Sequence, residues 1–148
     1  MALSLEIDFR ARKTVSIDNA TFTDLLTIFI WSCLEDRRTI LPIFGEKWHK
    51  LLYQTREALA GKYPFISEMI GEFDWDGRYP TSRKLNKNIP ALLYLLSHRH
   101  DFRMLVIDGR IVRSYFFSRS LAHLFLQLRG VISEMNNLAI QLKFFEED

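Results

Sequence analysis

The dipeptide Asp108-Gly109 constrains the fold more than any other feature of the sequence, because it separates two alternating runs of apolar residues. Asp-Gly between such runs is typical of a two-residue type I′ turn that joins antiparallel strands. The sequence therefore predicts a β-hairpin over residues 102–116. In that register Arg103 and Arg110 share one face of the hairpin, whereas Arg113 lies on the other face.

Apolar residues recur at helical spacing in most of the remaining chain. The last of these stretches is heptad-like and in phase across Gly130, which predicts one long helix that packs in the core or forms a dimer seam. Pro90 is expected in the first turn of its helix, since proline lacks the N–H of an interior position. Asp18 or Asn19 is expected to cap the first helix. About five helices are predicted, over residues 20–36, 46–60, 64–73, 88–99 and 117–142.

The N-terminal residues alternate between apolar and polar side chains. Leu5, Ile7 and Phe9 are separated by charged residues, and the alternation returns at Val15 and Ile17. A period of two residues is typical of half-buried strands. We therefore expect an N-terminal β-ribbon.

Length and composition indicate one compact folded domain over residues 1–148. The 148 residues are 48% hydrophobic and 26% charged, which is ordinary for a globular protein with a real core. Together with the predicted elements this gives an α+β fold that is mostly helical.

The number of cysteines and the length of the apolar runs indicate where in the cell the protein is expected. Cys33 is the single cysteine, so an internal disulfide is impossible and a reducing compartment is expected. The N-terminus has no apolar stretch typical of a secretory signal. The longest apolar run, residues 25–34, has about half the length that a bilayer-spanning helix needs. We therefore expect a cytoplasmic protein with no membrane partner, and a buried Cys33 thiol.

Positive charge is concentrated in residues 78–119. This segment has nine Lys and Arg residues against Asp101 and Asp108, a net charge of +7 in a chain whose total is +2. Such segregation is typical of a surface that binds a polyanion. It is also what a solvated surface paired with acidic neighbours would show.

Candidate phosphate contacts lie in the polar run at residues 82–88 and on the predicted hairpin. Arg and Lys side chains neutralise phosphates, and Ser and Asn side chains hydrogen-bond to them. Helix-capping loops have a similar composition, so the run is compatible with both roles. The candidate nucleic-acid-binding residues are Arg78, Ser82, Arg83, Lys84, Asn86, Lys87, Arg99, Arg103, Arg110 and Arg113.

The order helix, basic turn, helix and hairpin over residues 65–115 resembles the general layout of winged-helix DNA-binding domains. The resemblance is one of topology, without a sequence motif. It implies that a helix enters the major groove while the hairpin contacts the backbone. The helix after Pro90 is apolar, so the polar run before it would have to read the DNA.

Chemistry-bearing motifs are otherwise scarce. The sequence lacks the glycine-rich nucleotide loops, the paired Cys-x-x-Cys of zinc sites and the serine-hydrolase elbow. His98, His100 and Asp101 are the one cluster of catalytic residue types, and they could hold a metal or exchange protons. Histidines at a helix C-terminus also cap carbonyls. We expect a protein without enzymatic activity, metal or cofactor.

Two functions remain open. The first is a small nucleic-acid-binding protein, such as a regulator or a subunit of a nucleoprotein complex. The second is a protein-interaction module, such as an inhibitor, antitoxin or adaptor, that uses its basic and aromatic surface on an acidic partner. A homodimer through residues 117–142 is compatible with either function.

Two local contacts are also expected from the sequence. The acidic turn at 73–77 is expected to pair with Arg78 or Arg83, and His49 is expected to be partly buried and hydrogen-bonded.

Overall fold

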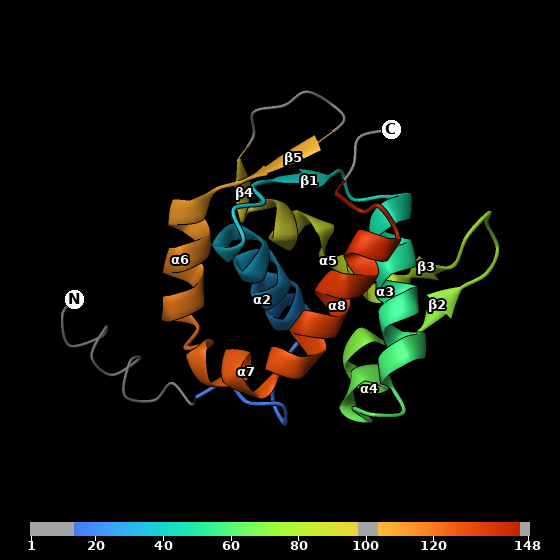
Figure 1. Cartoon of the computed structure of the whole chain (residues 1–148), viewed down its shortest axis with the longest axis horizontal. Coiled ribbons are helices and arrows are strands. Elements are labelled where there is room, and N and C mark those ends of the chain that lie inside the picture. Colours follow the sequence, from blue (N-terminus) through green and yellow to red (C-terminus); the bar gives the residue numbers. More distant parts are fainter. Residues whose placement is uncertain (1–13, 98–103, 146–148) are drawn as a thin grey trace.

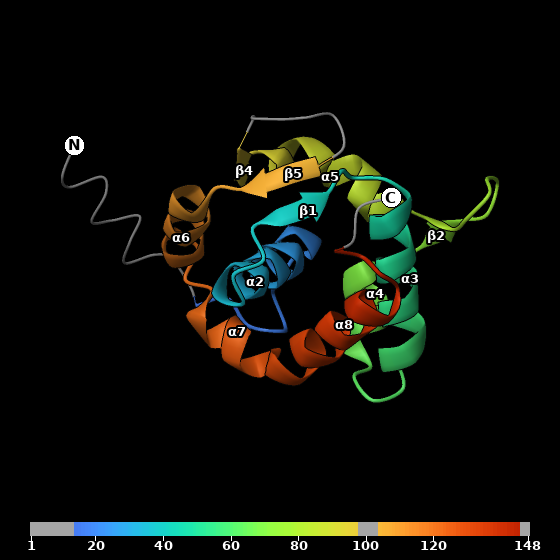
Figure 2. The same ribbon diagram turned by 45° about the horizontal axis from the view of Figure 1, so that its top comes forward.

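The helix α2 (Phe22–Glu35) lies at the centre of the molecule, with the other elements wrapped around it (Figures 1 and 2). The computed structural model describes residues 14–97 and 104–145. Eleven of the fourteen α2 residues are buried, so this helix is enclosed on every side instead of having one solvent-facing side.

Residues 14–21 lead into α2 without forming a strand. Ser16 donates its backbone N–H to Asn19 Oδ1 at 2.7 Å, and residues 17–19 form a turn. The predicted β-ribbon is therefore wrong at residues 14–17, because a local side-chain bond takes the place of a strand ladder. Its first strand, at Leu5 to Phe9, lies outside the described residues. The predicted helix at 20–36 is confirmed, but its cap is Thr21.

Thr21 and Asp24 form a reciprocal capping box at the start of α2. Thr21 Oγ1 accepts from the Asp24 N–H at 3.1 Å, and Asp24 Oδ2 accepts from the Thr21 N–H at 3.0 Å. The buried Asp24 carboxylate also accepts from Arg119, with Nη2 at 3.1 Å from Oδ2. These contacts satisfy a carboxylate that has no solvent exposure.

Three short antiparallel strands cover one end of α2 (Figure 2). Their order in the sheet is β1-β5-β4, so β1 and β4 are its edges. Ile40 pairs with Val106, and Leu96 pairs with Ile107. The strands are β1 (Ile40–Pro42), β4 (Leu96–Ser97) and β5 (Met104–Ile107).

The Asp108-Gly109 hairpin prediction is wrong. β5 is followed directly by α6 (Gly109–Ser118), and the Asp108 carboxylate accepts from the amides of Arg110 and Ile111, both at 3.1 Å. Aspartate favours a helix N-cap as strongly as a tight turn, and here the cap is used. The predicted second strand of the hairpin is thus helical, and the winged-helix resemblance over residues 65–115 is not confirmed.

After β1 the chain forms the helix α3 (Glu46–Leu59), which confirms the helix predicted at 46–60. The predicted helix at 64–73 is shorter and ends where Gly71 takes a φ of 83°. A small second sheet then forms as Phe73 pairs with Ser82 and Asp74 with Thr81. The elements are α4 (Phe65–Ile70), β2 (Phe73–Asp74) and β3 (Thr81–Ser82).

The next helix, α5 (Arg83–Leu93), begins five residues before the predicted start at Asn88. Ser82 caps it by accepting from the Leu85 N–H at 3.1 Å, so the polar run is helical. Pro90 lies inside α5 instead of in its first turn. Pro90 and Asn86 are both exposed, so water can satisfy the Asn86 carbonyl that the proline leaves without a donor.

The predicted single helix at 117–142 is three segments of helix. α6 ends at Ser118, and α7 (Ala122–Gln127) and α8 (Arg129–Gln141) follow. A straight helix of this length would extend roughly 39 Å, too far for one face to stay on a small core. The breaks let the chain curve beneath α2 (Figure 1).

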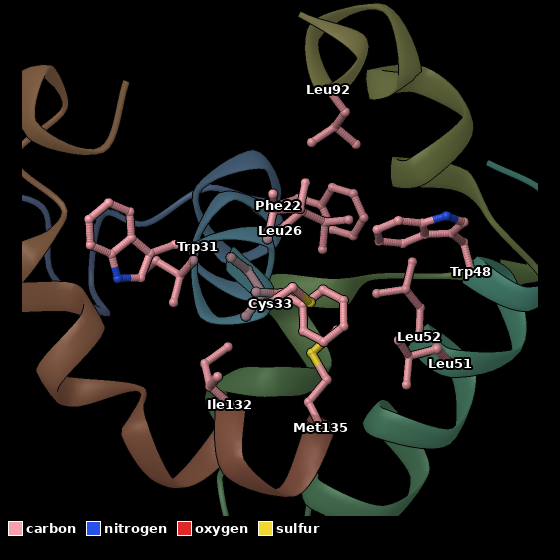
Figure 3. Packing of buried hydrophobic residues seen from close by; sticks show 14 of the residues in the cluster. Phe22, Leu26, Trp31, Cys33, Trp48, Leu51, Leu52, Leu92, Ile132 and Met135 are labelled. Atoms are coloured by element: carbon pink, nitrogen blue, oxygen red, sulfur yellow. The ribbon is translucent and has the colours of Figure 1, made fainter. Parts of the chain in front are cut away.

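The apolar stripe of that segment faces the interior of the chain. In the described residues Leu121, Leu124, Leu128, Val131 and Met135 are all buried, and Figure 3 shows Met135 and Ile132 pointing toward α2. Of the two roles predicted for this apolar stripe, packing in the core is thus confirmed. These five side chains are unavailable for a dimer seam.

Three helices of the described chain end in the same backbone motif. After α2, α6 and α8 the chain enters the left-handed region at Arg37, Ser120 and Lys143, with φ of 62°, 58° and 57°. After α2, Arg37 N–H donates to the Leu34 carbonyl and Arg38 N–H to that of Cys33. The other two ends repeat this pattern, which is the Schellman motif.

Gly130 in the first turn of α8 has a packing reason. A Cβ built at this position would overlap the hydroxyl oxygen of Tyr63, which packs against the core from the loop between α3 and α4. The close approach explains why a residue of poor helix propensity stands inside a helix.

We predict that Gly130→Ala destabilises the protein by about 1–2 kcal/mol, because the overlap outweighs the gain of about 1 kcal/mol in helix propensity. Urea denaturation of a double-mutant cycle with Tyr63→Phe tests this, since removing the hydroxyl should recover most of the loss. An equal cost of Gly130→Ala in both backgrounds would contradict the overlap as its cause.

We also predict that Arg119→Met costs about 2–3 kcal/mol of unfolding free energy. The change leaves the buried Asp24 carboxylate without its cation, and the partial exposure of Arg119 keeps the cost below that of a fully buried pair. Adding Asp24→Asn should reduce the loss, because the remaining buried group is then neutral. Equal loss in the single and double variants would show that the charge of Asp24 is not the cause.

Candidate nucleic-acid interface

The predicted interface residues around β3 and α5 have structural partners. Ser82 is fully buried, and its N–H donates to His49 Nδ1 at 2.9 Å while its hydroxyl caps α5. Arg83 Nε and Nη2 each lie 2.8 Å from Asp74 Oδ1. The expected pairing of the acidic turn with Arg83 is therefore confirmed. The carboxylate raises the pKa of Arg83, chiefly through this hydrogen bond.

Lys84 caps a neighbouring helix. Its Nζ donates to the carbonyls of Glu68 and Met69 at 2.8 and 3.2 Å, where α4 ends. Its side-chain carbons also lie over Gly71, so close that a Cβ there would clash with them. This placement satisfies carbonyls that the end of α4 leaves unpaired. Lys84 is thus a poor candidate for a phosphate contact.

The remaining candidates of this region are exposed. Arg78, Asn86 and Lys87 all lie at the surface. Lys87 and Lys84 line a groove of about 570 Å³, but Asp18 and Glu68 line it too. Two carboxylates balance the two ammonium groups, so this groove has little net attraction for a polyanion.

Arg99 and Arg103 lie outside the described residues, as do His98, His100 and Asp101. Within the described residues no group of three or more His, Cys, Asp and Glu side chains could hold a metal ion. The possible metal or acid–base site at His98, His100 and Asp101 therefore stays a prediction.

Arg110 and Arg113 are brought together by α6. On a hairpin they would face opposite sides, but on this helix they are three residues apart and share one exposed face. Neither has a side-chain hydrogen bond or an ion pair among the described residues. Burial of Val112 and Phe116 against the core holds the arginine face outward.

The same face of α6 has further side chains that sequence analysis did not select. Ser114 and Ser118 are exposed hydroxyls, and the Phe117 side chain is 65% exposed although its ring edge touches Trp31. The sequence signal for this set was the spacing of residues 110, 113, 114 and 117, which is the spacing of one helix face. It was missed because the segment was assigned to a strand. We call Arg110, Arg113, Ser114, Phe117 and Ser118 the α6 face.

The basic segment does not form one continuous surface in the described residues. α6 and the β2–β3 sheet lie on opposite sides of the molecule in both views (Figures 1 and 2). The basic side chains that the structure describes in this segment are thus divided between separate places. Near β3 and α5, Arg83 and Lys84 have protein partners, whereas the two arginines on α6 do not. The α6 face is the stronger of the two as an interface.

His49 on α3 is buried near the junction of β3 and α5, in keeping with the expectation from the sequence. Its side chain is 4% exposed, and Nδ1 accepts from Ser82, which assigns the proton of the neutral ring to Nε2. Burial lowers the pKa of His49, and a hydrogen bond with Asn86 partly opposes the shift. A second proton on the ring would break the bond from Ser82.

We predict that acidification below about pH 6.5 destabilises the protein through His49. Since the folded pKa lies below the unfolded one, the unfolded state takes up the proton first, and stability is lost as the pH falls through this interval. Urea denaturation between pH 7 and 5.5 should show a smaller decline for His49→Asn, whose amide oxygen can replace Nδ1 without titrating. Parallel declines for both proteins would exclude His49 as the source.

Cys33 does not contribute to any site in the described residues. Burial raises the pKa of its thiol to about 12, as expected for a packing residue that stays protonated. In the described part of the chain no helix is long and apolar enough to cross a membrane.

Comparison of the chain with protein-family models, with curated proteins and with solved structures found no match. The functional argument therefore depends on the residues of this chain and their arrangement.

Proposed function

We propose that this chain is a small nucleic-acid-binding protein that contacts phosphates through the α6 face. The observation that carries the proposal is the alignment of Arg110 and Arg113 on one exposed helix face. Arginine is the only charged residue type within α6, whose sequence is GRIVRSYFFS. Two guanidinium groups without an opposing carboxylate on the helix attract a polyanion and donate several hydrogen bonds to it.

The chemistry around the two arginines favours a nucleic acid. The Ser114 hydroxyl can donate to a phosphate oxygen further along a backbone, whereas that of Ser118 donates to the Tyr115 carbonyl. The exposed ring of Phe117 offers a surface on which an unpaired base can stack, and such stacking is worth about 1–3 kcal/mol per base. A base within a duplex is already stacked, so the α6 face suits a single strand better.

The role that follows is that of a regulator or a subunit of a nucleoprotein complex, without enzymatic activity of its own. A cytoplasmic location is part of this proposal, in keeping with the single cysteine. Arg99 and Arg103, in the connection between β4 and β5, remain further candidates for contact.

Fluorescence anisotropy with labelled single-stranded and duplex oligonucleotides over a salt series tests the proposal. We predict that Arg110→Ala/Arg113→Ala weakens binding to all sequences and reduces the log–log salt slope by roughly 1.4, about 0.7 for each phosphate on a single strand. Phe117→Ala should weaken single-strand binding more than duplex binding. The Phe117 ring is largely exposed, so this change should leave the fold intact.

The matched control is Arg78→Ala/Lys87→Ala, which removes the same charge from exposed positions near β3 and α5. It should change affinity much less than the α6 pair, although both lower the net charge equally. Equal losses for the two pairs would indicate diffuse attraction and contradict a site on α6. Absence of binding to any oligonucleotide at low salt would reject the proposed function.

A further inference from the structure

A second basic region lies where α2 and α8 both end, in residues that the proposed function does not use. Here a groove of about 490 Å³ is lined by three cations and three large apolar side chains. This volume is within the usual range for ligand sites. We call it the C-end groove; its main lining residues are Arg37, Arg38, Ile40, Ile140, Lys143 and Phe145.

Among the described residues, the charges that line the C-end groove are all positive. No carboxylate of the described residues lines it, in contrast to the groove beside Lys84. Arg37 and Lys143 have no ion pair within the described chain, and Arg38 stacks on the Phe145 ring at 4.3 Å from its centroid. That stacking joins the ends of α2 and α8 and leaves the other two cations free for a ligand.

The two free cations occupy positions that favour glycine. Arg37 and Lys143 are the residues at which the Schellman motifs of α2 and α8 enter the left-handed region. Glycine adopts that conformation without strain, whereas an L side chain does so at a cost. Cations near a helix C-terminus offset part of this cost through the helix dipole. Both strained cations line the same groove, which points to a use for their charge.

The apolar lining is unusually exposed. Ile40 is 50% exposed and Ile140 is 53% exposed, although both are large aliphatic side chains. A ligand that met only the cations would leave these side chains in water. The groove therefore fits a partner that brings carboxylates and aliphatic groups together.

The edge strand β1 adds a backbone partner to the groove. Because Ile107 N–H donates to the Thr39 carbonyl at 2.8 Å, the alternation of an antiparallel ladder turns the N–H and C=O of Ile40 away from β5. A peptide backbone beside Ile40 could pair with these groups. Pro42 lacks an N–H, and its carbonyl accepts from Trp48 Nε1, so the pairing would stop there.

We infer that the C-end groove binds a short acidic and aliphatic peptide segment of a partner protein. Carboxylates of the segment pair with Arg37 and Lys143, its aliphatic side chains cover Ile40 and Ile140, and its backbone lies along the start of β1. This is a second interface, on different residues from the α6 face, and it holds whether or not α6 binds nucleic acid.

The test uses the full chain and a dye-labelled peptide in which Glu and Leu alternate, followed by fluorescence anisotropy. We predict saturable binding that Arg37→Gly/Lys143→Gly weakens about tenfold or more, as expected for the loss of two charge-assisted contacts. Glycine suits both backbone positions, so the melting temperature of this variant should be unchanged or higher. Ile140→Gln should also weaken binding, because it removes the apolar contact from an exposed helix position.

Two control variants show whether the groove itself binds the peptide. Ser120→Gly makes the same backbone change at the third left-handed position, outside the groove, and should leave peptide binding unchanged. Arg110→Ala/Arg113→Ala removes equal charge from α6 and should also leave it unchanged. A peptide of alternating Lys and Leu should not bind.

Several results would overturn the inference. Unchanged peptide affinity in a folded Arg37→Gly/Lys143→Gly variant would exclude the groove. Equal binding of a polyglutamate peptide would remove the aliphatic part of the recognition. Displacement of the Glu–Leu peptide by an oligonucleotide or by phosphatidylserine vesicles, lost in the same glycine variant, would assign the groove to a phosphate-bearing ligand instead of a peptide.

Discussion

The ion pair between Asp24 and Arg119 neutralises the one charged side chain that is buried in the central helix α2. A polar side chain that is enclosed on all sides has no access to water, so its polar atoms need partners inside the protein. Asp24 satisfies the start of α2 through the capping box, and Arg119 supplies the opposite charge from the end of α6. The first turn of α2 and the α6–α7 junction are thereby held to one another.

Other polar groups of α2 follow the same rule. Thr27 donates to the Thr23 carbonyl, and Ser32 donates to that of Phe29 and accepts from Asn136 Nδ2 on α8. The helices around α2 must curve to stay in contact with it, which accounts for the short segments and the repeated Schellman ends. The left-handed residues at those ends are also what brings Arg37 and Lys143 into one groove.

Much of the α-helical framework could be predicted from the sequence, because apolar periodicity and helix ends are local signals. The helices α2 and α3 are examples. The pairing of Asp74 with Arg83 could also be predicted, because the two residues are close in the sequence. The prediction failed at Asp108, where turn and cap preferences coincide and only the sheet partner decides between them. β5 pairs with β1 and β4, both earlier in the chain, and no local pattern indicates that. The α6 face was hidden for the same reason: its helical spacing has meaning only after residues 109–118 are known to be helical.

The pairing of β1 with β5 has a consequence for how the chain folds. Ile40 and Val106 are adjacent in the sheet but more than sixty residues apart in the sequence. Contacts of such long range require closure of a large loop before they contribute to stability, so they tend to form late and slow the folding rate. The C-end groove takes its edge from β1, and α6 starts where β5 ends. A newly made chain would therefore form its helices, α6 among them, before the C-end groove is complete, and the groove would gain its β1 edge only when the sheet has closed.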